Sequence, residues 1–159
     1  MREVLYLIGW TFVPALELRA SIPIGILTYD MEVYEVVTVC VLANIALGII
    51  FYSLLDTVIK LFRKMAWFDR IYQKLLVRAQ HKIQKYVDKW GELGIAIFIG
   101  IPLPGSGVIT GAMGSYAIGL KKRKFMVANV IGVLIAATIV TIVTLTGNEM
   151  FRRIFIRSV

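Results

Sequence analysis

Two oppositely charged side chains stand close together in an otherwise apolar stretch. Glu17 and Arg19 are the only charged residues of Val4–Thr28, within the sequence PALELRASIPIG. A charged side chain at membrane depth costs at least about 2.5–3.5 kcal/mol on insertion scales, so such residues mark a functional site or a paired structural one. Glu17 can titrate as a proton or cation site, while Arg19 can receive an anionic group. The alternative is an internal Glu17–Arg19 ion pair, or an Arg19 that holds carbonyls exposed at a helix break.

A second candidate site is the sequence PLPGSG at Pro102–Gly107. The successive amides of Gly105, Ser106 and Gly107 can form an anion-binding nest, assisted by the N-terminus of the following helix. The alternative is a tight turn in which Ser106 bonds its own backbone. Further binding candidates are Ser21 and Pro23 in the first sequence, and Pro102 and Pro104 in this loop. Asn44 and Asn129, in the apolar stretches, complete the set. The two asparagines are expected to bond across helices, or to the broken segments.

The composition predicts an all-α integral membrane protein. The chain has 159 residues, of which 58% are hydrophobic, and its mean hydropathy is +0.78. A bilayer-spanning helix needs about 20 apolar residues. Stretches of that length are Val4–Thr28, Val33–Ile59, Leu93–Leu120 and Phe125–Leu145.

All four prolines lie inside these apolar stretches. Pro14 and Pro23 are expected to interrupt the first, and Pro102 and Pro104 the third, because proline removes a backbone donor and breaks a helix. A broken segment survives at membrane depth only where protein or a water-filled cavity covers its freed backbone groups. Transporters build their binding sites at such breaks, so the pattern favours transport over simple anchoring.

The middle segment, Lys60–Glu92, has nine basic and three acidic residues, and its apolar residues recur in steps of three and four. This pattern predicts an amphipathic helix that lies on the cytoplasmic leaflet or packs under the bundle. The positive-inside rule places this segment and Lys121–Lys124 in the cytoplasm. Because Leu93–Leu120 joins them, we expect it to be a re-entrant hairpin. Lys121–Lys124 reads as a headgroup anchor, with Arg123 as a candidate guide for an incoming phosphate.

The two halves of the chain are similar in pattern. Phe12, Gly25 and Asn44 recur at nearly the same spacing as Phe98, Gly111 and Asn129. We therefore expect one membrane domain over residues 1–159 that contains an inverted repeat. Each repeat (4–59 and 93–147) has a re-entrant hairpin and a transmembrane helix, and the linker helix 60–92 joins them. The two hairpin tips would meet near the midplane.

Several function classes are disfavoured. The sequence has none of the motifs typical of serine hydrolases, zinc proteases, P-loop enzymes or dinucleotide-binding enzymes, so no enzyme activity and no cofactor are expected. The single cysteine (Cys40) and single histidine (His81) do not predict a metal site. The net charge of +8 lies beside membrane spans without a nucleic-acid motif, so anionic lipids are the expected partners, and not nucleic acid.

The motifs together resemble the small multidrug export protein family, which is related to the DedA (SNARE-associated/VTT) superfamily. The resemblance rests on ELRASIPIG at Glu17–Gly25, PLPGSG at Pro102–Gly107 and KKRKF at Lys121–Phe125. It implies paired re-entrant segments and a transport role. DedA proteins carry further acidic residues in their first hairpin, which this chain lacks beyond Glu17.

These observations predict a small multi-pass transporter of the cell (plasma) membrane. We expect ion-coupled export of small or amphipathic solutes through a site between the two hairpins. A flippase for lipid-linked phosphates such as polyprenyl phosphate is one alternative, and a non-transporting membrane scaffold is another. We also expect a homodimer, because two broken segments and two spans enclose little volume.

Overall fold

The structure is a computed structural model that describes residues 2–14, 16–62, 66–90, 93–103 and 105–156. These residues form helices and turns without a strand, as the sequence predicts. The helices are α1 (Arg2–Phe12), α2 (Glu17–Leu27), α3 (Val33–Phe62), α4 (Ala66–Trp90), α5 (Leu93–Gly100), α6 (Val108–Ala117) and α7 (Lys122–Ile156).

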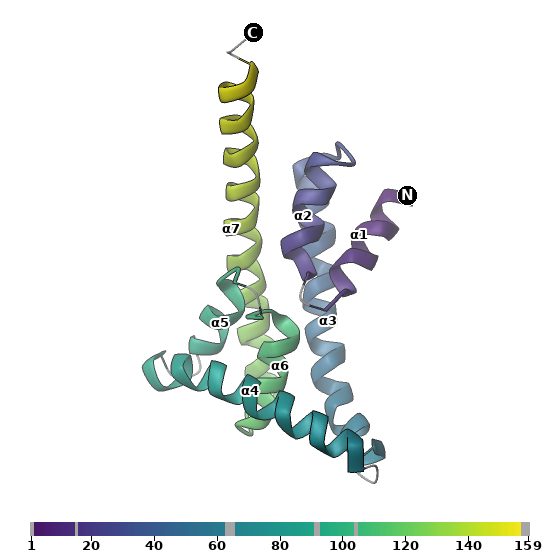
Figure 1. The fold of residues 1–159 in the computed structure, drawn as a ribbon, viewed down its shortest axis with the longest axis vertical. Helices are drawn as coiled ribbons and strands as arrows, with labels where there is room; N and C mark the ends of the chain where they lie inside the picture. The colour runs from purple at the N-terminus through teal and green to yellow at the C-terminus, as the bar shows by residue number, and fades with distance from the viewer. Residues whose placement is uncertain (1, 15, 63–65, 91–92, 104, 157–159) are drawn as a thin grey trace.

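Two of the described helices are long and apolar enough to cross a membrane. The qualifying parts are Val33–Leu55 of α3 and Lys122–Gly147 of α7. Neither helix contains proline, and α3 alone has 30 residues, or about 45 Å at about 1.5 Å per residue. That length exceeds the roughly 30 Å of bilayer hydrocarbon. In Figure 1 both helices run along the long axis of the molecule, while α4 crosses near one end.

Each of the other two apolar stretches is divided into two short helices. α1 and α2 are separated at Val13–Leu16, where Pro14 lies, and α5 and α6 are separated by the loop at 101–107. The turn between α1 and α2 faces the loop between α5 and α6 in Figure 1. We call these two helix pairs the first and second hairpins. Pro102 lies in the loop of the second hairpin, and Pro104 lies outside the described residues.

Pro23 does not interrupt the chain, in contrast to the expectation from the sequence. It lies inside α2, which continues from Glu17 to Leu27. Its ring removes only the amide that would bond the carbonyl of Arg19, one turn earlier. α2 packs against α1, α3 and α7. These contacts keep the helix intact although one backbone hydrogen bond is missing.

α4 packs beneath the second hairpin. Ala79 and Ile83 are buried, and a Cβ atom added to Gly114 of α6 would lie 2.9 Å from each of Ala79 O and Ile83 Cγ2. The predicted packing under the bundle is therefore present, whereas binding of α4 to a lipid surface stays a prediction. Lys60–Glu92 is not a single helix: α3 extends to Phe62 before α4 begins at Ala66, because its apolar pattern continues through Leu61 and Phe62.

The two halves have the same order of elements, with two short helices followed by a long one. The matching glycines also have matching environments. A Cβ atom on Gly25 of α2 would lie 3.1 Å from Leu7 of α1, and one on Gly111 of α6 would lie 2.7 Å from Ile99 of α5. In each hairpin, glycine thus allows the second short helix to approach the first. An inverted relation of the halves across a membrane stays a prediction.

Candidate functional site

The Glu17 carboxylate binds the N-terminus of α6, on the opposite hairpin. Its Oε2 accepts a hydrogen bond from the Val108 amide at 2.9 Å, and its Oε1 accepts one from the Ile109 amide at 3.3 Å. The first amides of a helix have no partner within the helix, and Gly107, at the cap position, has no side chain to supply one. Glu17, which is only 3% exposed, supplies that cap from a distant part of the sequence. Its negative charge also suits the positive end of the helix dipole.

The backbone on both sides of this contact is specialised for it. Glu17 has a φ of 48°, a left-handed conformation that costs a non-glycine residue about 1–3 kcal/mol. On the other side, a Cβ atom at residue 107 would lie 2.3 Å from Glu17 Oε1. The carboxylate therefore requires a glycine at position 107. The strained backbone of Glu17 occurs at the residue whose side chain makes these two buried hydrogen bonds.

Arg19 binds the carbonyl groups of the loop at 101–107. Its Nη1 donates to Leu103 O at 2.7 Å, and its Nη2 lies 3.2 Å from Ile101 O, 2.9 Å from Ser106 O and 3.1 Å from Ser106 Oγ. The loop follows the C-terminus of α5, where carbonyls lack helical partners and the dipole is negative. The guanidinium group thus supplies both hydrogen bonds and a complementary charge at the break.

Ser106 completes the loop from within. Its Oγ donates to Ile101 O at 2.6 Å and lies 2.9 Å from Leu103 O. The Leu103 amide lies 3.3 Å from the same hydroxyl. Gly105 has a φ of +77°, which glycine adopts without the usual steric cost. The expected turn in which Ser106 bonds its own backbone is present, and the same hydroxyl also contacts Arg19 of the first hairpin, which the sequence does not predict.

The sequence ELR thus places opposite charges on opposite helix ends of the second hairpin. The carboxylate meets the N-terminus of α6, and the guanidinium meets the carbonyls after α5. Within the described part of the chain, Glu17 and Arg19 do not form an ion pair with each other at 4 Å or less. We call this two-part contact between the hairpins the ELR clasp. The N-terminus of α6, predicted to assist an anion nest, binds the carboxylate of Glu17 through the Val108 and Ile109 amides, whereas the Ser106 amide donates to Leu103 O within the loop.

Two hydroxyl groups brace the first hairpin behind the ELR clasp. Thr11 of α1 donates to Ser21 Oγ at 2.8 Å, and Ser21 lies 3.2 Å from the Glu17 carbonyl. Both side chains are buried. Ser21 therefore positions the turn that carries Glu17. The sequence does not predict Thr11 as a site residue, because its spacing from other polar residues is no different from that of a threonine on a lipid-facing helix.

Asn44 and Asn129 lie between the two long helices. Asn129 Nδ2 on α7 donates to Ile45 O on α3 at 3.2 Å, so this asparagine bonds across helices as expected. A Cβ atom on Gly48 would lie 2.5 Å from both Asn129 Nδ2 and Val108 Cγ1. Asn129 therefore sits close to the start of α6. Asn44 is also fully buried, and the Oδ1 atoms of both asparagines lack a hydrogen-bond partner.

A basic cavity of about 410 Å³ borders the ELR clasp. It is lined by α4, by α5 and by the loop, through His81, Lys82, Lys85, Tyr86, Phe98, Leu103, Gly105 and Ser106. Lys82 Nζ lies 3.4 Å from Gly105 O. The charge pattern of α4 alone predicts an exposed basic stripe that includes Lys82, but not that this stripe borders the loop. The charged side chains of its lining, Lys82 and Lys85, are both basic, so an anionic group suits this cavity.

Of the remaining candidates, Pro102 lies in the loop between Ile101 and Leu103, whose carbonyls Arg19 binds. Pro23 lies inside α2. Arg123 borders a different cavity, between α5 and α7. Across the described residues, His, Cys, Asp and Glu side chains do not gather in groups of three or more that could hold a metal ion.

Residues 17–139 match the sequence model of the family described as "Putative small multi-drug export protein". The matched region contains both hairpin tips, α4 and most of α7. No match was found among curated proteins or among solved structures. Together with the two apolar helices, the match identifies a membrane protein of an export family, so the first part of the resemblance is confirmed. The relation to the DedA superfamily stays a prediction.

Proposed function

The chain belongs to the small multi-drug export protein family, and on that premise we propose an ion-coupled membrane transporter for small or amphipathic solutes. The observation that carries the proposal is the ELR clasp. Two hairpins that interrupt the apolar stretches meet there through charged groups instead of through apolar packing alone. Broken helices with exposed ends are the usual place for substrate and ion sites in transporters.

In this proposal Glu17 is the coupling group. It is the buried carboxylate among the side chains that the structure describes. While ionised, it binds two amides of α6. Protonation removes the charge that complements the helix dipole and weakens these charge-assisted hydrogen bonds. Proton uptake would therefore loosen the first hairpin from α6 and favour a second arrangement of the two hairpins.

The substrate would occupy the basic cavity beside the loop. Lys82 and Lys85 provide positive charge, and Tyr86 and Phe98 provide an aromatic wall with ring centroids 5.3 Å apart. A shift of the loop on release of the ELR clasp would change this cavity directly, because Ser106 belongs to both.

We also propose that both hairpins are re-entrant, that α4 faces the cytoplasm at the plasma membrane, and that the transporter is a homodimer.

A flippase for lipid-linked phosphates is the second candidate. The observation that favours it is the charge of the same cavity, to which Lys82 and Lys85 contribute. A phosphate pairs well with such groups, whereas a cationic drug would be repelled. A scaffold function gains no comparable support, since it would not require interrupted helices.

We expect Glu17→Gln to uncouple substrate movement from proton movement. The amide keeps the size of the side chain and removes its titration. Full-length protein is reconstituted into vesicles that contain a pH-sensitive dye, and either taurocholate, an anionic amphipathic solute, or a polyprenyl phosphate is added as the probe. Wild type should show a probe-dependent proton flux, and Glu17→Gln should reduce it at least tenfold.

Glu3→Gln serves as the control, because Glu3 is an exposed carboxylate on the first helix. It should leave the flux unchanged. A response to taurocholate alone supports export of amphipathic solutes, and a response to polyprenyl phosphate alone supports the flippase. A proton flux that is unchanged in Glu17→Gln would refute the coupling role of Glu17.

A further inference from the structure

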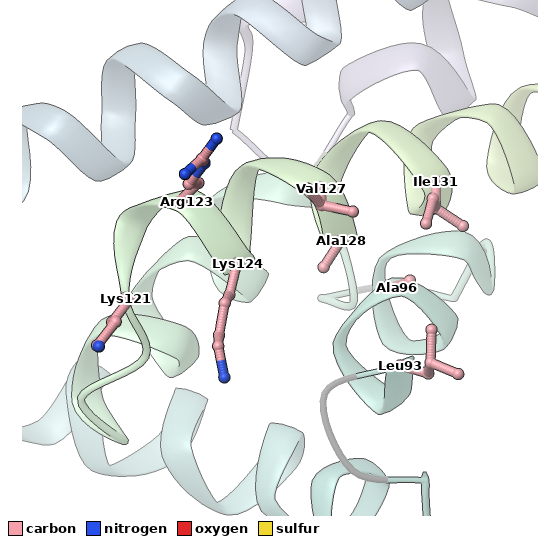
Figure 2. A pocket seen from close by; sticks show the side chains of 8 residues that line it. All are labelled: Leu93, Ala96, Lys121, Arg123, Lys124, Val127, Ala128 and Ile131. Carbon is pink, nitrogen blue, oxygen red and sulfur yellow. The ribbon is translucent and has the colours of Figure 1, made fainter.

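A second cavity lies away from the ELR clasp, between the starts of α5 and α7. Its volume is about 430 Å³. Leu93 of α5 and Val127 and Ile131 of α7 contribute apolar walls, and Lys121 and Lys124 contribute a basic rim. Arg123 also lines the cavity. Figure 2 shows Lys124 extending into the open space on the side of Leu93, whereas the Arg123 guanidinium points to the other side of α7.

The apolar wall is exposed although α5 and α7 are otherwise tightly packed. Leu93 is 64% exposed and Val127 is 58% exposed. Next to the cavity, a Cβ atom on Gly132 of α7 would lie 2.8 Å from the Ala96 carbonyl oxygen of α5. The cavity is therefore a defined wedge beside a close helix contact. Its surface at membrane depth suits a hydrocarbon chain, which fills such a space without the loss of any polar interaction.

The basic rim lies at one end of this apolar wall. Lys121, Arg123 and Lys124 are adjacent to the first turn of α7, and all three are exposed. The N-terminus of α7 adds the positive end of a helix dipole at the same place. The ionisable groups that line the cavity are all basic. A ligand that matches both parts has an anionic head and an apolar tail.

We propose that this wedge is a binding site for an anionic phospholipid. The phosphate would lie between Lys121 and Lys124 at the start of α7, and one acyl chain would lie along Leu93, Val127 and Ile131. Such a lipid would brace α5 against α7 and so support the second hairpin. This site is independent of the proposed transport site, and either proposal can fail without the other.

The test is native mass spectrometry of the full-length protein with phosphatidylglycerol and phosphatidylcholine of identical acyl chains. We expect phosphatidylglycerol to bind at least fivefold more tightly than phosphatidylcholine. Lys121→Gln/Lys124→Gln should remove that preference. Val127→Trp, which fills the wedge and keeps every charge, should also lower the affinity for phosphatidylglycerol at least fivefold. Val127 is exposed, so the tryptophan does not disturb the core.

Lys122→Gln is the matched control, because Lys122 belongs to the same basic run but does not line the cavity. It should keep the preference. Glycerol phosphate, which has the head without the tail, should bind at least tenfold more weakly than phosphatidylglycerol. The proposal is overturned by equal binding of the two lipids, by equal loss in Lys122→Gln, by tight binding of Val127→Trp, or by equal affinity for glycerol phosphate.

Discussion

Replacing Arg19 by lysine is expected to lower the thermal unfolding midpoint of the protein by about 5–10 °C, although the charge is kept. The guanidinium fork reaches the carbonyl oxygens of Ile101, Leu103 and Ser106 through two nitrogens. A lysine has one nitrogen and cannot span these acceptors. Hydrogen bonds to a charged group contribute about 1.5–3 kcal/mol each, and for a chain of this size 1 kcal/mol corresponds to about 2–4 °C.

The measurement is circular dichroism of the purified protein in detergent during heating. Arg78→Lys is the control, since it makes the same exchange at an exposed position of α4. It should change the midpoint by less than 1–2 °C, because surface substitutions are usually within about 0.5 kcal/mol. Equal midpoints for Arg19→Lys and Arg78→Lys would show that Arg19 does not hold the loop of the second hairpin.

Replacing Gly107 by alanine is expected to destabilise the protein by about 3–5 kcal/mol, the usual cost of leaving a buried charge without its partner. The added Cβ atom would lie 2.3 Å from Glu17 Oε1 and 2.5 Å from Oε2, so the carboxylate must leave the α6 amides. Gly107 has a φ of −85°, a conformation that alanine adopts readily. The effect therefore reports the contact with Glu17 and not backbone strain.

Two comparisons identify the cause of this effect. Gly9→Ala is the control, because nothing lies within 4 Å of a Cβ atom at Gly9, and alanine in a helix should be neutral or stabilising by up to about 1 kcal/mol. In a Glu17→Ala background, Gly107→Ala should cost little more, since the partner is already absent. Strict additivity of the two substitutions would contradict the proposed contact.

The sequence predicts the elements better than it predicts their contacts. The break at Pro14 and the unbroken helices α3 and α7 follow from proline placement and apolar length. The predicted break at Pro23 is wrong, because a proline inside this packed helix removes only one hydrogen bond. The apolar pattern of α3 also continues past residue 59 through Leu61 and Phe62, so the helix extends beyond the expected boundary of the first repeat.

The same distinction holds for the candidate site. Glu17 and Arg19 are recognisable because charge is costly at membrane depth. Their partners are backbone amides and carbonyls of residues 101–109, and any residue type carries those groups. Lys82 comes to the loop through the docking of α4 beneath α6, which depends on long-range contacts that no local spacing encodes.

The central claim is that the second hairpin enters and leaves the membrane on one side, so that its loop can meet the first hairpin in between. Its most direct test uses Lys89→Cys and Lys122→Cys, one at a time, in a Cys40→Ser background that removes the chain's single cysteine. Lys89 precedes α5 and Lys122 follows α6, and both are exposed. Labelling intact cells and inverted vesicles with a membrane-impermeant maleimide should modify both cysteines from the cytoplasmic side only. Labelling of the two cysteines from opposite sides would contradict the account.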